Sequence, residues 1–122
     1  MLLVPGNHDT RSGALPPELR IETTAAELIE PPFVFKHHPE ASQPEASPPG
    51  ALPKCYALGG HIHPAIRLAG RGRQTERVAC FLFQREYGVL PAFGTFTGNA
   101  DIALQPADRA FAVAADQILE LT

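Results

Sequence analysis

Proline and glycine constrain the fold of this chain more than any other feature of its sequence. The 122 residues include 13 prolines and 10 glycines, and both residue types interrupt helices. The apolar runs between them are short, which favours strands and turns over long helices. A chain of this length is too short for two domains. We therefore expect one strand-rich domain over residues 1–122.

Composition excludes several classes of protein. The hydrophobic content of 44% argues against a wholly disordered chain, and the net charge of −3 neither favours nor opposes a nucleic-acid partner. No apolar run approaches the length of a membrane span, and residues 1–5 lack the basic start of a signal peptide. Cys55 and Cys80 have no motif spacing, so we expect buried or half-buried thiols in a reducing, cytoplasmic location.

Short apolar runs mark the expected strands, at residues 2–4, 33–35, 56–58, 65–68, 78–83, 87–90, 111–113 and 118–121. A final hairpin would turn at Asp116-Gln117. We expect a loop at residues 11–18. The pattern at residues 21–29 is compatible with either a helix or a strand. Residues 39–53 contain five prolines and predict a surface loop, either a lid on the substrate side or a simple insertion.

All five histidines lie in three short stretches that each follow an apolar run, at residues 5–9, 35–39 and 59–64. In an extended backbone, His61 and His63 would point to the same side and could bind one cation, or one each of an adjacent pair. Gly59-Gly60 would let the backbone turn tightly there. Each stretch also has an ordinary explanation, as a turn or a solvated strand end, but the three together in this order favour a metal site.

The first of these stretches adds two further chemical groups. Asn7 offers a neutral carbonyl oxygen, which suits harder cations such as Mn²⁺. His8 is followed by Asp9, a pair that suggests an imidazole held in one tautomer by a carboxylate and ready to act as a general acid.

The order of these motifs resembles the calcineurin-like metallophosphoesterases. Gly-Asn-His-Asp, a strand ending in His-His-Pro, and Gly-His-Ile-His-Pro are similar to the third, fourth and fifth motifs of that family, over residues 3–68. The stretches at residues 60–73, 80–81, 89–98 and 107–121 resemble the bacterial subgroup called ligase-associated DNA damage response endonuclease.

This resemblance implies an α+β fold, a partial four-layer αββα sandwich that is β-rich in the part present. It implies a hydrolase that cleaves phosphodiesters in DNA during repair with two Mn²⁺ ions, and that associates with a DNA ligase or helicase. The implied ligands are Asn7, His37 and His61 for one ion and His63 for the other. His8 would protonate the leaving oxygen or stabilise the transition state, and Asp9 would orient His8. The family pattern favours His38 as a neighbour of the site over a ligand.

The chain departs from the family in one respect that matters for chemistry. The family's Asp-x-His and Gly-Asp-x-x-Asp motifs do not precede Asn7. Two dications held about 3.5–4 Å apart repel each other, and carboxylates normally offset that repulsion. The remaining ligands are all neutral, so we expect at most one ion, bound weakly, and little or no activity. We expect a truncated C-terminal portion of a single domain, with Met1 a mis-assigned start, over a genuine short remnant. An exposed sheet edge would then favour self-association.

Arginines concentrate after the His-x-His stretch, and Arg67, Arg71 and Arg73 are candidates for binding substrate phosphates. A solvated hairpin explains them equally well. Tyr87 and Phe93 could stack on a base, but we expect both to pack in the core. The alternative function is a non-catalytic module in which the arginine stretch and a sheet edge bind a nucleic acid or a protein.

Overall fold

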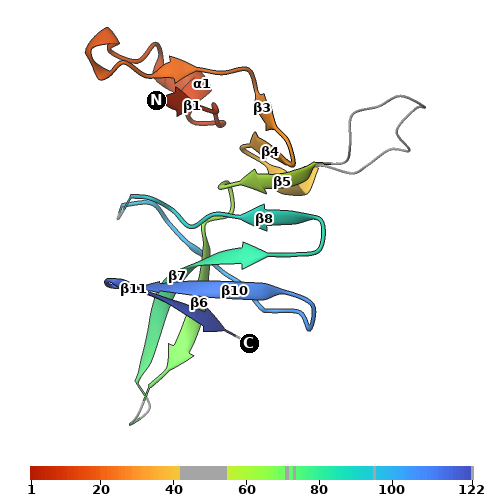
Figure 1. Ribbon diagram of the computed structural model, residues 1–122. Coiled ribbons are helices and arrows are strands. Elements are labelled where there is room, and N and C mark those ends of the chain that lie inside the picture. The colour runs from red at the N-terminus through yellow and green to blue at the C-terminus, as the bar shows by residue number, and fades with distance from the viewer. Residues whose placement is uncertain (42–54, 71, 73, 95, 122) are drawn as a thin grey trace, which may run out of the picture. The chain divides into compact units, whose positions relative to one another are not determined.

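The computed structural model describes residues 1–41, 55–70, 72, 74–94 and 96–121. The chain divides into two compact units, residues 1–61 and 62–122 (Figure 1). The assignment of residues 1–122 to a single domain stays a prediction. Of the proline-rich stretch at residues 39–53, only the first three residues are described, and they form a short 3₁₀ helix, η2 (Pro39–Ala41).

The first unit contains five short strands and very little helix in its described part. Its elements are β1 (Leu2–Leu3), α1 (Asp9–Ser12), η1 (Pro17–Leu19), β2 (Glu22–Thr23), β3 (Glu27–Glu30), β4 (Phe33–Lys36), η2 and β5 (Tyr56–Gly59). β1 and β2 pair in parallel. β4 is the central strand of the other group, because it pairs antiparallel with β3 and parallel with β5. The parallel pairing sets Phe35 opposite Leu58, so both strands end at the same edge.

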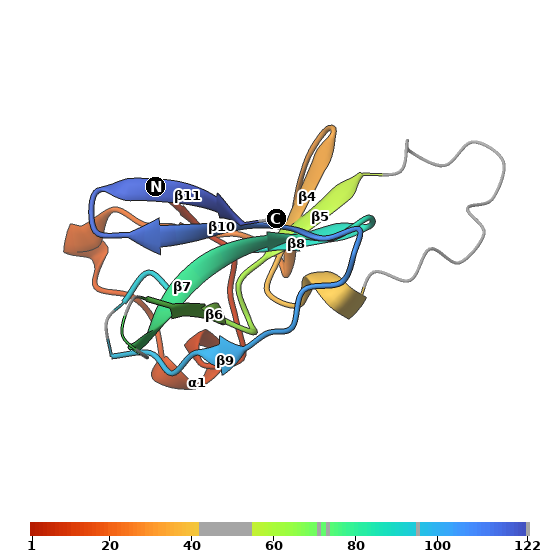
Figure 2. The same ribbon diagram turned by 90° about the horizontal axis from the view of Figure 1, so that it is seen from below.

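The second unit is built around one long strand. Its elements are β6 (Pro64–Ala69), β7 (Thr75–Phe83), β8 (Tyr87–Val89), β9 (Ala100–Asp101), β10 (Arg109–Ala114) and β11 (Gln117–Leu121). The first half of β7 pairs with β6, and its second half pairs with β10 and β8. β11 completes a hairpin with β10, and β9 lies parallel to β6 (Figure 2).

Small side chains dominate the core of the second unit. Its most deeply buried hydrophobic residues are Ala65, Cys80, Leu82, Val89, Ala110 and Ala112. Alternate residues of β10 are buried, as the period of a strand with one buried face requires. Burial raises the pKa of the Cys80 thiol above its ordinary value, because the thiolate would lose its hydration.

The strand-rich character expected from the sequence is confirmed, and every expected run lies wholly or partly in a strand. The open segment at residues 21–29 contributes β2 and most of β3. The loop expected at residues 11–18 overlaps the end of α1 and the start of η1. The four-layer αββα sandwich stays a prediction. Within the described residues, no helix has the length and apolar character needed to cross a membrane.

Candidate metal centre

The parallel pair β4 and β5 brings the histidines of the first unit together. His37 and His38 follow β4 directly, and His61 follows β5 after one glycine. Because parallel strands end at the same edge, the residues that follow them are neighbours. The backbone N–H of His61 donates to the carbonyl of His37 at 3.1 Å and fixes this arrangement.

Three donor atoms meet around the ring of His37. Its Nε2 atom lies 2.7 Å from Asn7 Oδ1 and 3.0 Å from His61 Nδ1. A neutral imidazole nitrogen carries at most one proton, which these two partners would have to share. A cation at the same place would accept lone pairs from all three atoms. The residues present therefore fit one metal ion.

Two glycines make this close packing possible. A Cβ atom on the buried Gly6 would lie 2.6 Å from the Nδ1 and Cε1 atoms of the His37 ring. A Cβ atom on Gly59 would lie 2.3 Å from the carbonyl oxygen of Lys36 and 2.9 Å from that of His37. Gly59 was expected from the sequence to allow a tight backbone. Gly6 was not, although its place directly before Asn-His-Asp was a usable signal.

His38 belongs to the same group of side chains. One ligand nitrogen from each of His37, His38 and His61 lies within 4.8 Å of the others. The ring centroids of His38 and His61 are 3.8 Å apart. His38 Nδ1 also lies 3.3 Å from Glu40 Oε1. Sequence reasoning favoured His38 as a neighbour of the site over a ligand and did not consider Glu40.

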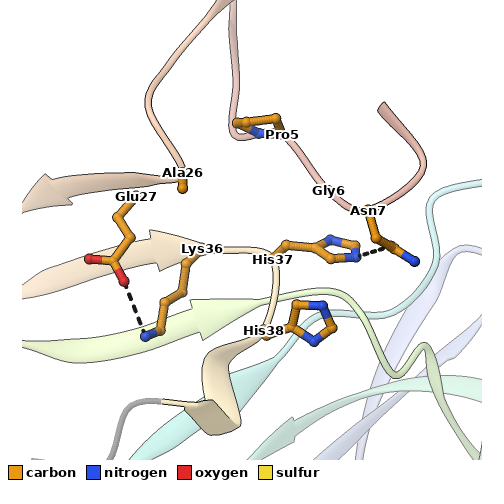
Figure 3. A pocket seen from close by; sticks show the side chains of 8 residues that line it. All are labelled: Pro5, Gly6, Asn7, Ala26, Glu27, Lys36, His37 and His38. Atoms are coloured by element: carbon orange, nitrogen blue, oxygen red, sulfur yellow. Dashed lines mark hydrogen bonds and ion pairs between the residues drawn. The ribbon is translucent and has the colours of Figure 1, made fainter. Parts of the chain in front are cut away.

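A cavity of about 360 Å³ opens beside this cluster (Figure 3). Its lining includes Asn7 and His37, whose side chains point toward each other, and His38 below them. Another part of the lining is an ion pair in which Lys36 Nζ lies 3.3 Å from Glu27 Oε1. The cavity therefore gives a ligand access to the candidate metal centre.

His8 and Asp9 lie at the start of α1. His8 is exposed, and its carbonyl accepts hydrogen bonds from Arg11 N–H and the Ser12 hydroxyl. Asp9 Oδ2 accepts from the N–H of Gly6 at 2.7 Å. The carboxylate thus holds the turn that carries Asn7. The catalytic role of His8, and the orientation of His8 by Asp9, stay predictions.

The second unit begins at Ile62, and His63 is its second residue. Its φ of 52° is in the left-handed region, and residues 61 and 62 form a turn. The condition under which both imidazoles would point to one side, an extended backbone from residue 61 to residue 63, is therefore not met, because the chain turns before β6 begins. His63 Nδ1–H donates to the carbonyl of Gly98 at 2.9 Å. That bond leaves Nε2 as the nitrogen available to a cation.

The arginine stretch is described only in part. Arg67 and Arg77 both bind Asp101, through N···O distances of 2.8 Å and 2.5 Å. The hydrogen bond from Arg67, together with Arg77, holds the pKa of Asp101 below its ordinary value. Arg71 and Arg73 lie outside the described residues, and a phosphate-binding role for Arg67 stays a prediction.

One expectation about the aromatic residues is wrong. Phe93 does not pack in a core, because its side chain is 108% exposed, and Phe96 nearby is 104% exposed. Both lie in the connection between β8 and β9, where the described residues form no regular strand that would bury them. Tyr87 lies in β8 and is half-buried, as a packed residue would be.

The chain matches no protein-family model and no curated protein. It is similar to a solved structure, that of nuclease MPE from Pseudomonas putida, with a TM-score of 0.74 and 31% sequence identity. The fold is nuclease-like. The similarity covers 98% of this chain and 53% of the nuclease, so the chain spans about half the length of that protein.

Proposed function

We propose that this chain carries part of the metal site of a phosphodiester hydrolase that acts on nucleic acid. The observation that carries the proposal is the convergence of Asn7, His37 and His61 at the ends of two parallel strands. The nuclease-like fold supports the same reaction class. The finer part of the proposal is a metallophosphoesterase that acts as an endonuclease on DNA in repair, in the company of a ligase or helicase.

Each residue of the site has a separate task. Asn7, His37 and His61 would hold one ion, and His63 would contribute to a second in a complete enzyme. A bound divalent ion lowers the pKa of a water ligand and stabilises charge on phosphoryl oxygens. His8 would protonate the leaving oxygen, for which its exposed position at the start of α1 leaves room. Asp9 would keep the turn at Gly6 closed, which positions Asn7.

The ion and the level of activity follow from the charge of the ligands. All of them are neutral, so two dications would repel each other without a carboxylate to offset the repulsion. We expect one ion on this chain, and Mn²⁺ in a complete site that also contains carboxylates. The hydrolysis catalysed by the 122-residue chain is therefore expected to be weak.

The test is hydrolysis of bis(p-nitrophenyl) phosphate and of a labelled DNA oligonucleotide, with Mn²⁺ added. The wild-type chain should release product above the rate of metal-containing buffer, and His61→Ala and His8→Ala should return the rate to that background. Glu18→Gln, an exposed change in η1, is the control and should keep the wild-type rate. Absence of hydrolysis in the wild type, or its survival in both histidine variants, would refute the proposal.

A second function is favoured by a different observation. The exposed rings of Phe93 and Phe96 could stack on unpaired bases without any reaction, since stacking contributes about 1–3 kcal/mol per base. The measurement is fluorescence anisotropy of a labelled oligonucleotide in the presence of EDTA. Binding that is lost in Phe93→Ser with Phe96→Ser would support a non-catalytic binding module. Equal anisotropy with and without the protein would exclude it.

A further inference from the structure

We propose that His38, positioned by Glu40, is the third imidazole ligand of a single zinc-class ion held with His37 and His61. This inference rests on the metal site of the proposed function and adds to it a ligand, a positioning residue and a metal preference. The family resemblance instead favoured His38 as a neighbour of the site and assigned His63 to a second ion, so only the present assignment requires His38 for binding the first ion.

The geometry of the rings supports a three-imidazole site. Nitrogen ligands lie about 2.0–2.1 Å from Zn²⁺, so two of them on one tetrahedral ion are about 3.3–3.4 Å apart. His37 Nε2 and His61 Nδ1 are 3.0 Å apart, close to that separation. The full set spans 4.8 Å, which a rotation of one side chain would close. The His38 side chain is 44% exposed and has room for that rotation.

Glu40 supplies the contact that a metal-binding histidine usually makes with its second nitrogen. Histidine ligands commonly donate this N–H to a carboxylate, which fixes the ring and raises its basicity. His38 Nδ1 lies 3.3 Å from Glu40 Oε1, so Nε2 remains to bind the ion. The other oxygen, Glu40 Oε2, is buried and has no hydrogen-bond partner among the described residues. A cation bound to His38 would lie near this carboxylate and offset part of the cost of leaving that oxygen without a partner.

The donor set determines the kind of ion. Imidazole nitrogens suit Zn²⁺, Cu²⁺ and Ni²⁺, whereas Mn²⁺ favours carboxylate, carbonyl and water oxygens. Three neutral imidazoles with one amide oxygen nearby resemble the donor sets of zinc sites more than those of manganese sites. The single cluster described here should therefore bind Zn²⁺ more tightly than Mn²⁺.

The experiment is isothermal titration of the 122-residue chain with Zn²⁺ and, separately, with Mn²⁺. The wild type should bind one Zn²⁺ with higher affinity than Mn²⁺. Glu40→Gln should weaken Zn²⁺ binding about 10- to 100-fold, as the loss of a carboxylate that holds a metal-binding histidine does. His38→Gln should weaken it by at least as much, and His63→Gln by less than about 3-fold. Circular dichroism in EDTA checks that each variant is folded.

A second measurement uses the wild-type protein, so its result does not depend on whether the variants fold. In ¹⁵N NMR spectra of the imidazole rings, Zn²⁺ should shift the His38 Nε2 resonance together with those of His37 and His61. A loss of Zn²⁺ affinity in His63→Gln but not in His38→Gln, or an unmoved His38 resonance, would overturn the inference. If hydrolysis requires His61 but Zn²⁺ binding does not require His38, the inference fails and the proposed function stands. If Zn²⁺ binds as predicted but no hydrolysis occurs, the proposed function fails and the inference stands.

Discussion

Replacing Gly6 with alanine tests whether the metal cluster depends on close packing against the His37 ring. The added Cβ would lie 2.6 Å from two ring atoms and 3.0 Å from a third, so either the backbone or the ring must move. Overpacking a filled site costs about 1–3 kcal/mol. If the ring moves, the hydrogen bond that His37 Nε2 shares between Asn7 and His61 is lost, at about 0.5–1.5 kcal/mol. The two routes therefore predict a loss of about 0.5–3 kcal/mol in the free energy of unfolding.

Urea unfolding followed by circular dichroism in EDTA measures this loss, and titration with Zn²⁺ measures the accompanying fall in affinity. Gly60→Ala is the matched control, because a Cβ atom there would meet no atom within 4 Å. The control should lie within about 0.5 kcal/mol of the wild type. Equal stability and equal Zn²⁺ affinity for the two variants would refute the packing argument.

Three further substitutions or modifications test other parts of the structure. Gly59→Ala should lower the free energy of unfolding at least as much as the Gly6 variant, because its Cβ would lie 2.3 Å from a backbone oxygen that cannot rotate away. A free energy of unfolding in urea within about 0.5 kcal/mol of the wild type would contradict this. Asp101→Asn removes a carboxylate whose pKa is lowered in the folded state. The ion pairs of that carboxylate therefore stabilise the fold fully above the unfolded-state pKa of about 3.9, and this stabilisation disappears as the pH falls through the folded-state pKa. The wild type should therefore melt above the Asp101→Asn variant at pH 7 and converge with it in acid, and a pH-independent difference would count against the ion pair. A maleimide should label Cys55 in the native chain and the fully buried Cys80 only in urea, so equal native labelling rates would contradict the described core.

Local sequence patterns predicted the strands well where the side chains are apolar. They failed for a strand that forms only because it pairs with its neighbour. β3 has three exposed residues out of four, so no burial pattern marks it. It forms because the chain folds back onto β4, with Glu30 paired to Phe33. α1 was missed because its residues are polar and it is only one turn long.

The site was predictable in its residue types and only partly in its geometry. The strand-end pattern marked the three stretches that contain all five histidines, and the family resemblance grouped Asn7, His37 and His61 as ligands of one ion. The structure brings these three together. Three features could not be inferred from local sequence. They are the left-handed backbone of His63, the approach of Gly6 to the His37 ring and the contact of His38 with Glu40. The approach of Gly6 depends on where the distant segment after β4 lies, whereas the other two depend on local backbone and side-chain conformations that the residue types alone do not determine.

The number of metal ions bound per chain tests the central claim most directly. Wild-type protein equilibrated with Zn²⁺, passed through a desalting column and analysed by inductively coupled plasma mass spectrometry should retain about one ion per chain, because one imidazole cluster is described. His61→Ala should retain almost none, since it removes a nitrogen 3.0 Å from His37 Nε2. A wild type without metal, or a His61→Ala variant with as much metal as the wild type, would contradict the account.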